Sequence, residues 1–228
     1  MGARTCRLFV IASLVFAFVP LSAEPFYYYA EELNGSGLFP VGWTKDGRFF
    51  AYGVWRESMQ IARHVDLSIQ VQDLVTDEIA WSFFKSWDES LMGGPEDTTP
   101  YPPGSVSEAW GIVGDEIDAN LQRLGIQHAM LGMQELPYVI YDTDDTISVE
   151  IAMKGELEYD VRARSKKLGV KTIYSGKKGM DDDELRVIGY VPAPGGLRIA
   201  VVLESAPLGM PLTSLIVIGC NVKSGYKK

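Results

Sequence analysis

Residues 41–54 read VGWTKDGRFFAYGV, and this stretch decides the fold class. Apolar residues lie on both sides of Asp46-Gly47, and an Asp-Gly pair between apolar runs is the strongest short-range signal of a β-hairpin. Gly47 can adopt a positive φ without steric cost, and Asp46 tolerates the turn conformation. The stretch therefore predicts two antiparallel strands joined by a tight turn.

Two further strands are expected after this hairpin. Residues 67–72 alternate between apolar and polar side chains, which indicates a strand with one buried face and one wet face. A polar turn at Thr76-Asp77 follows, and residues 78–84 then form another strand, rich in aromatic side chains. Residues 41–84 thus predict a four-stranded antiparallel meander.

The centre of the chain predicts a loop and one helix. Residues 93–103 read GGPEDTTPYPP, a Gly/Pro-rich run that regular structure cannot accommodate. Ser105 and Glu108 then have the spacing of a capping box, and Gly125 suits the position just after a helix. Between them, apolar residues recur every three or four positions: Ala109, Val113, Ile117, Leu121 and Leu124. One amphipathic helix is therefore expected between Ser105 and Gly125.

The rest of the chain predicts a second β region. Residues 147–153, 157–164 and 170–174 are expected to be strands, separated at Gly155 and Gly169. Residues 189–202 read GYVPAPGGLRIAVV and predict a hairpin, followed by an apolar strand at 215–218. The predicted fold class is therefore mainly β (α+β), with antiparallel meanders and with the Pro-rich loop and one helix inserted between them.

The first meander resembles a blade of the TolB-type and WD-repeat β-propellers. The matching features are Trp43, the turn 45–48, the small-apolar strand 50–52, and a strand that ends in Asp73 before Thr76. The hairpin 189–202 resembles a second, partial copy of the same motif. The alternative is that two unrelated hairpins share a turn chemistry. Blades take about 40–45 residues and at least about four are needed, so no closed propeller is expected in this chain.

The order of all these parts resembles a family of predicted bacterial secreted proteins of unknown function. The resemblance covers an arrangement of turns and strands and brings no catalytic residues with it. It implies an envelope or extracellular location.

The N-terminus supports export. Arg4 and Arg7 precede an apolar run of about 12 residues, Pro20 follows, and Ala23 offers a small residue for cleavage. We expect a signal peptide at 1–23 and a single mature domain at 24–228, with sub-parts 24–90, 91–145 and 146–228. The alternative is an uncleaved anchor, but crossing a hydrocarbon core of roughly 30 Å takes about 20 helical residues. The expected product is secreted or periplasmic, with no membrane span.

Charge and cysteine content restrict the partners and the chemistry. Residues 1–23 hold two arginines and no acid, so their removal takes the formal net charge from −9 to −11. Such a chain is repelled by nucleic-acid phosphates and by anionic lipid headgroups. Cys6 precedes the apolar run and is not placed as a lipid-modified cysteine, and its removal leaves Cys220 alone, so no internal disulfide is expected.

The candidate chemical groups are few, and we assign no catalytic residue, no metal ligand and no cofactor. His64 is expected in a loop and His128 just past the helix, and neither has a nucleophile motif beside it. Cys220 ends an apolar strand and is expected to be a buried small hydrophobe. The acidic clusters 142–145 and 181–184 lack the glycine and the distal Glu of a calcium loop, and are expected to be turns.

Aromatic residues suggest where the protein binds. Trp87 and Tyr101 flank the Pro-rich loop and are the aromatic residues most expected to be exposed, so they form the candidate interaction surface. The alternative is that the aromatic residues, which alternate along the strands, belong to an ordinary strand core. The sequence therefore favours a non-catalytic binding protein of the bacterial envelope, whose partner is another envelope protein or a glycan. Two alternatives stay open: an envelope hydrolase that acts on glycan through paired carboxylates, and a metal-dependent module.

Overall fold

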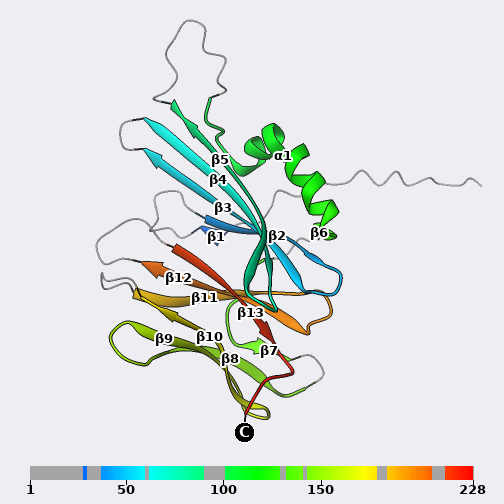
Figure 1. Ribbon diagram of the computed structural model, residues 1–228, viewed down its shortest axis with the longest axis vertical. Helices are drawn as coiled ribbons and strands as arrows, with labels where there is room; N and C mark the ends of the chain where they lie inside the picture. The colour runs from blue at the N-terminus through cyan, green and yellow to red at the C-terminus, as the bar shows by residue number, and fades with distance from the viewer. Residues whose placement is uncertain are drawn as a thin grey trace, which may run out of the picture.

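In the computed structural model, three antiparallel sheets and one helix stack as layers (Figure 1). The structure describes residues 28–29, 37–59, 62–89, 101–128, 132–140, 143–178, 184–206 and 214–227. Within these residues the fold is mainly antiparallel β and the sheets do not close into a propeller, so the predicted fold class is confirmed. The predicted signal peptide lies outside the described residues.

The first layer, which we call the N-terminal sheet, contains the predicted meander. Its strands run in the order β1 to β5, and β6 also pairs with β2. The turn between β2 and β3 has Gly47 at φ 67°, as the Asp-Gly pair predicted. The strands are β1 (Tyr28–Tyr29), β2 (Gly37–Thr44), β3 (Phe49–Met59), β4 (Arg63–Asp73), β5 (Glu78–Asp88) and β6 (Ile126–His128).

Helix α1 (Val106–Arg123) covers one face of the N-terminal sheet (Figure 1). Ser105 caps it, because its side chain accepts a hydrogen bond from the backbone N–H of Glu108 at 3.2 Å. Gly125 follows the helix with φ 72°. The buried residues of α1 pack on the inner side chains of β2, β3 and β4, among them Phe39, Ala51 and Leu67. The predicted helix and both of its ends are confirmed.

The remaining strands form two more layers. The middle sheet contains β11 (Glu184–Pro192), β12 (Arg198–Ala206) and β13 (Ser214–Asn221), in that order. The C-terminal sheet contains β10 (Gly169–Lys177), β9 (Glu158–Ser165), β8 (Thr146–Met153) and β7 (Tyr138–Val139). The strands predicted in this half, including the hairpin at 189–202, are all present.

The middle sheet is apolar on both faces because it has a sheet on either side. On one face, Ala200, Val202 and Val217 pack against Trp43 and Phe50 of the N-terminal sheet. On the other face, the odd-numbered residues of β12 pack against the C-terminal sheet. The run Ile199–Leu203 is therefore buried without interruption, as expected for a strand covered on both sides.

The end of β4 and the turn that follows it join the first two layers. The side-chain amide of Gln72 donates to the carbonyl oxygen of Val217 at 2.8 Å, and the N–H of Gly219 donates to Asp77 Oδ1 at 2.8 Å. A Cβ atom at position 219 would overlap the carbonyl oxygen of Leu74, so glycine permits this close approach. The helix in the described part of the chain lacks the length and apolar character needed to cross a bilayer.

Candidate binding edge of the N-terminal sheet

The N-terminal sheet ends in a long strand, β5, whose outer side pairs with no other described strand. β5 pairs with β4 along its length, and within the described residues no other strand pairs with it. It extends over 11 residues. An edge strand of this length presents a row of backbone N–H and C=O groups that are available for pairing with another chain.

Two hydrogen bonds establish which backbone groups of β4 face β5. The N–H of Leu74 donates to the carbonyl oxygen of Arg48 at 2.9 Å, so even-numbered residues of β4 direct their backbone groups towards β3. At the other end, the N–H of Arg63 donates to Glu89 Oε2, on the side of β5, at 3.0 Å. Because backbone directions alternate along a strand, the odd-numbered residues of β4 face β5.

The same alternation assigns the free groups of β5. Each odd-numbered residue of β4 from Val65 to Val71 lies opposite an odd-numbered residue of β5. The four residues of β5 that therefore bond to β4 through their backbone groups are Trp81, Phe83, Lys85 and Trp87. The residues between them, Ser82, Phe84 and Ser86, direct their N–H and C=O groups away from the sheet.

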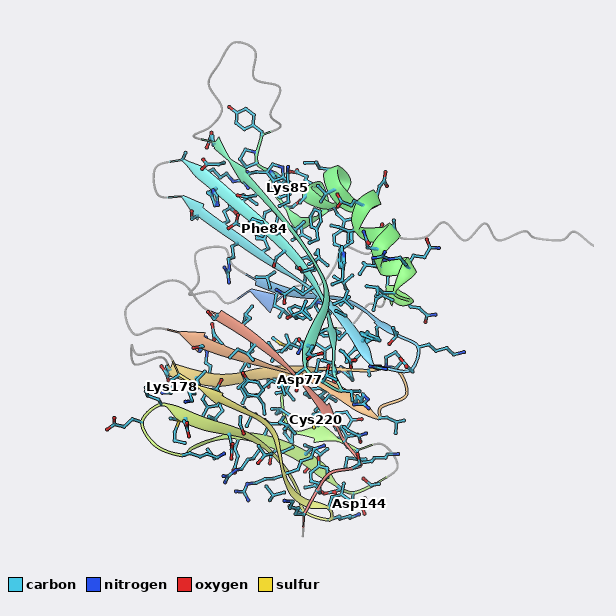
Figure 2. The ribbon with its side chains drawn as sticks, in the orientation of Figure 1. Asp77, Phe84, Lys85, Asp144, Lys178 and Cys220 are labelled. Atoms are coloured by element: carbon cyan, nitrogen blue, oxygen red, sulfur yellow. The ribbon has the colours of Figure 1, made fainter. Side chains whose placement is uncertain are left out.

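The side chains of β5 are unusually apolar for an open edge. Phe84 is 65% exposed on the face opposite α1, and Ile79 is also exposed. Trp81 and Phe83 are half-buried against the core beneath α1, and Lys85 is exposed on that same side. Figure 2 shows Phe84 and Lys85 on β5, in the part of the N-terminal sheet that extends beyond the middle sheet.

Three edge strands of the other two sheets, β10, β11 and β13, have outer backbone groups that bond to another part of the chain. Gln72 and Asp77 bond to the outer side of β13 at Val217 and Gly219. On β11, Tyr190 exchanges two backbone hydrogen bonds with Gln134, at 2.8 and 2.9 Å. On β10, Val170 exchanges two with Lys227. These contacts block strand addition at those positions, whereas no such contact is found on β5 within the described residues.

The backbone conformation of Asp77 suits its hydrogen bond to the outer side of β13. This residue adopts φ 59°, a left-handed conformation that is uncommon outside glycine, and this directs its carboxylate towards β13. Burial raises the pKa of Asp77 above its usual value, while the hydrogen bond from Gly219 acts in the opposite direction.

The two residues of the predicted interaction surface have different environments. Tyr101 is 73% exposed, as expected. Trp87 is 2% exposed, so the prediction that it is exposed is wrong. Its side chain lies on the same face of β5 as Trp81 and Phe83 and packs into the core beneath α1. Residues 93–100 of the Pro-rich loop lie outside the described residues.

His64 lies in strand β4, so its predicted loop position is also wrong. Its Nε2 atom is 3.1 Å from Asp66 Oδ1 and 3.3 Å from Ser86 Oγ, and its Nδ1 atom is 3.5 Å from Asp88 Oδ2. The order Ser86, His64, Asp88 is that of a Ser-His-Asp triad. These residues meet because Asp66 and Ser86, and His64 and Asp88, are cross-strand pairs.

The environment of His64 does not suit nucleophilic catalysis. Each ring nitrogen faces a carboxylate, and a carboxylate accepts hydrogen bonds from an N–H group. Asp66 therefore favours a proton on Nε2, the atom that would have to take the proton from Ser86 Oγ. We interpret the cluster as a polar contact that joins β4 and β5.

Buried carboxylates elsewhere have structural partners. Asp160 forms an ion pair with Lys154 at 2.6 Å and accepts a hydrogen bond from Ser175 Oγ at 2.6 Å; these contacts lower its pKa to about 2. Asp145 accepts from Ser165 Oγ and two backbone N–H groups, which lowers its pKa as well. Glu204 is paired with Arg186.

The described members of the predicted acidic clusters are Thr143, Asp144 and Asp145 in the first and Glu184 in the second. Asp145 points inwards to Ser165, and Asp142 and 181–183 lie outside the described residues. Among described residues, no three His, Cys, Asp or Glu side chains are grouped as a metal ion would require.

Cys220 and His128 take up the positions expected of them. Cys220 is buried on β13, and burial raises the pKa of its thiol. Nearby, Lys171 Nζ donates to the carbonyl oxygens of Asn221 and Ser224 and lies 4.6 Å from the centre of the Tyr226 ring. His128 lies on β6, just past α1, 3.3 Å from Asp118.

Comparisons of the chain with protein-family models, with curated proteins and with solved structures gave no match.

Proposed function

We propose that this chain is an exported binding protein that takes up an extended polypeptide segment along β5 by β-strand addition. The observation that carries the proposal is the open edge itself: Ser82, Phe84 and Ser86 direct their backbone groups outwards, next to exposed apolar side chains. In this mode of recognition, main-chain hydrogen bonds supply affinity and the flanking side chains supply specificity.

The contrast between the edges supports this assignment. β10, β11 and β13 each have outer backbone groups bonded to another part of the chain. Folded proteins commonly block exposed edges because open ones associate with other chains. The outer edge of β5 is open and carries the exposed Phe84 side chain, and a binding role explains this combination better than an incidental exposure does.

Three buried carboxylates have a structural role and do not support glycan hydrolysis. Hydrolysis needs two carboxyl groups about 5 to 9.5 Å apart around a bound sugar, one of them able to act as an acid. Asp145, Asp160 and Glu204 are each held by hydroxyl, amide or cationic partners inside the fold. Groups engaged in this way stabilise the sheets.

We also propose a secreted or periplasmic location, on the basis of residues 1–23 and of the resemblance to predicted bacterial secreted proteins. N-terminal sequencing of the protein from its native host is expected to begin at or near Glu24. Recovery of an intact Met1 from a membrane fraction would contradict this location.

Site-specific photo-crosslinking tests the binding role. A benzophenone amino acid at position 84 is expected to form an adduct whose cross-linked peptide maps to an extended segment. The matched control is position 139 on β7, where Val139 is 59% exposed and is also apolar. A synthetic peptide of the captured segment should slow hydrogen exchange at the outward amides of Ser82, Phe84 and Ser86. Equal capture at both positions, or unchanged exchange on β5, would refute the proposal.

A further inference from the structure

The edge of β5 is complementary to itself, and we propose that the strand it accepts belongs to a second copy of the same chain. This inference rests on the proposed function of β5 as a strand-accepting edge and names its partner. Two copies related by a twofold axis would pair their β5 strands in antiparallel fashion and join two N-terminal sheets into one continuous sheet.

The outward backbone groups restrict how two copies can pair. In an antiparallel ladder, a residue that points its backbone groups outwards must meet another residue that does so. Ser82, Phe84 and Ser86 are the outward residues in the regular part of β5. A twofold axis at Phe84 satisfies this condition, because Phe84 then faces Phe84 of the second copy and Ser82 faces Ser86.

Two alternative registers, with the axis at Phe83 or at Ser82, are less favourable. An axis at Phe83 would place Glu78 opposite Asp88 of the second copy, and directly opposed like charges destabilise a ladder. An axis at Ser82 would extend the pairing across Ala80, where the register with β4 shifts. The Phe84 register places Asp88 opposite the small, uncharged Ala80 and makes no like-charge pair on β5.

The side chains on both faces fit the Phe84 register. On the face opposite α1, the two Phe84 rings meet at the axis, with the small side chains of Ser82 and Ser86 on either side. This pairing would bury the most exposed aromatic side chain of β5. On the α1 face, Lys85 lies opposite Phe83 of the second copy, and an ammonium group near an aromatic ring is attracted to it. Symmetry makes this contact twice.

The interface follows a single strand edge, so it belongs to the small, transient class of interfaces. We therefore expect a dimer that dissociates on dilution, with a Kd on the order of micromolar. Sedimentation velocity of the purified protein from about 1 to 100 µM should show a shift from monomer to dimer.

Two substitutions at one position test the register. F84K is expected to leave a monomer throughout this range, because it places two ammonium groups at the axis. The control V139K should dimerise as the original chain does. F84C in a C6S background should form a disulfide-linked dimer on mild oxidation, since residues in a hydrogen-bonded antiparallel pair lie about 5.5 Å apart at Cα. V139C should not, and Cys220 is buried in both proteins.

The outcomes separate this inference from the proposed function. A chain that stays monomeric at 100 µM while F84C fails to cross-link would overturn the second-copy inference. If position 84 still captures a segment of a different protein in that case, strand addition on β5 stands and only the identity of the partner is wrong. If position 84 captures no extended segment at all, both proposals fail.

Discussion

Two side chains, Gln72 near the end of β4 and Asp77 in the turn after it, close the outer edge of β13. Gln72 donates to Val217 and Asp77 accepts from Gly219, so the outer row of β13 is occupied by side chains of the neighbouring sheet. The same turn leads into β5, whose own outer row has no equivalent contact in the described part of the chain. The residues that occupy the outer edge of β13 therefore lie next to β5, whose own outer edge stays available.

Asp160 contributes to the stability of the C-terminal sheet in a way that depends on pH. Its ion pair and hydrogen bonds lower its pKa to about 2, below the usual value of 3.8. A carboxyl whose pKa is lowered by folding stabilises the native state above its unfolded pKa and loses this contribution as pH falls. D160N should therefore be less stable than the original chain at pH 7, with a smaller further loss between pH 4 and pH 2.

Urea unfolding followed at several pH values measures this effect. D144N is the matched control, because Asp144 is exposed and near the start of the same sheet. It should reproduce the pH dependence of the original chain. An unchanged pH profile for D160N would show that the Lys154 and Ser175 contacts do not stabilise the fold.

Trp87 shows what sequence reasoning missed at single positions and why. Its position next to a Pro-rich loop suggested exposure, but Trp81, Phe83 and Trp87 alternate in phase along β5. This alternation was a usable signal, since side chains two residues apart share a face of a strand. The identity of the layer that covers this face, α1, was not available from β5 alone.

At the scale of elements, local signals succeeded and long-range ones did not. The Asp-Gly turn and the Ser105 cap specify structure through neighbouring residues, and both appear as predicted. The pairing of β6 with β2 and the blocking of β13 by Asp77 depend on contacts between distant parts of the chain. The open edge of β5 belongs to this second group, because only the sheet order shows that no other described strand pairs with its outer side.

The contact of the β4–β5 turn with β13 should be sensitive to one methyl group. A Cβ at position 219 would overlap the carbonyl oxygen of Leu74, whereas nothing lies within 4 Å of a Cβ at position 155. G219A is therefore expected to lower the free energy of unfolding by about 1 to 3 kcal/mol, as overpacking in a core does. G155A should leave it nearly unchanged. Chemical denaturation measures the free energy of unfolding of the two variants. Equal values for G219A and G155A would refute the tight contact at Gly219.

For the molecule as a whole, the middle sheet makes the stack one unit. It shares one core with the N-terminal sheet and a second core with the C-terminal sheet. Exposing either face of β12 on unfolding would leave a row of apolar side chains in water, which is unfavourable at about 25 cal/mol for each Å² of apolar surface. Loss of one outer layer should therefore destabilise the layer on the far side.

The distribution of tryptophans provides a test of this coupling. The five tryptophans lie in the N-terminal sheet and α1: Trp43, Trp55, Trp81, Trp87 and Trp110. Tryptophan fluorescence therefore reports on that part and, through Trp43, on its core with the middle sheet, but no tryptophan lies in the C-terminal sheet. Far-ultraviolet circular dichroism reports on the strands of all three sheets. If the stack unfolds as one cooperative unit, the two signals must follow the same denaturation curve. Two separated transitions would mean that the C-terminal sheet unfolds independently of the other two layers.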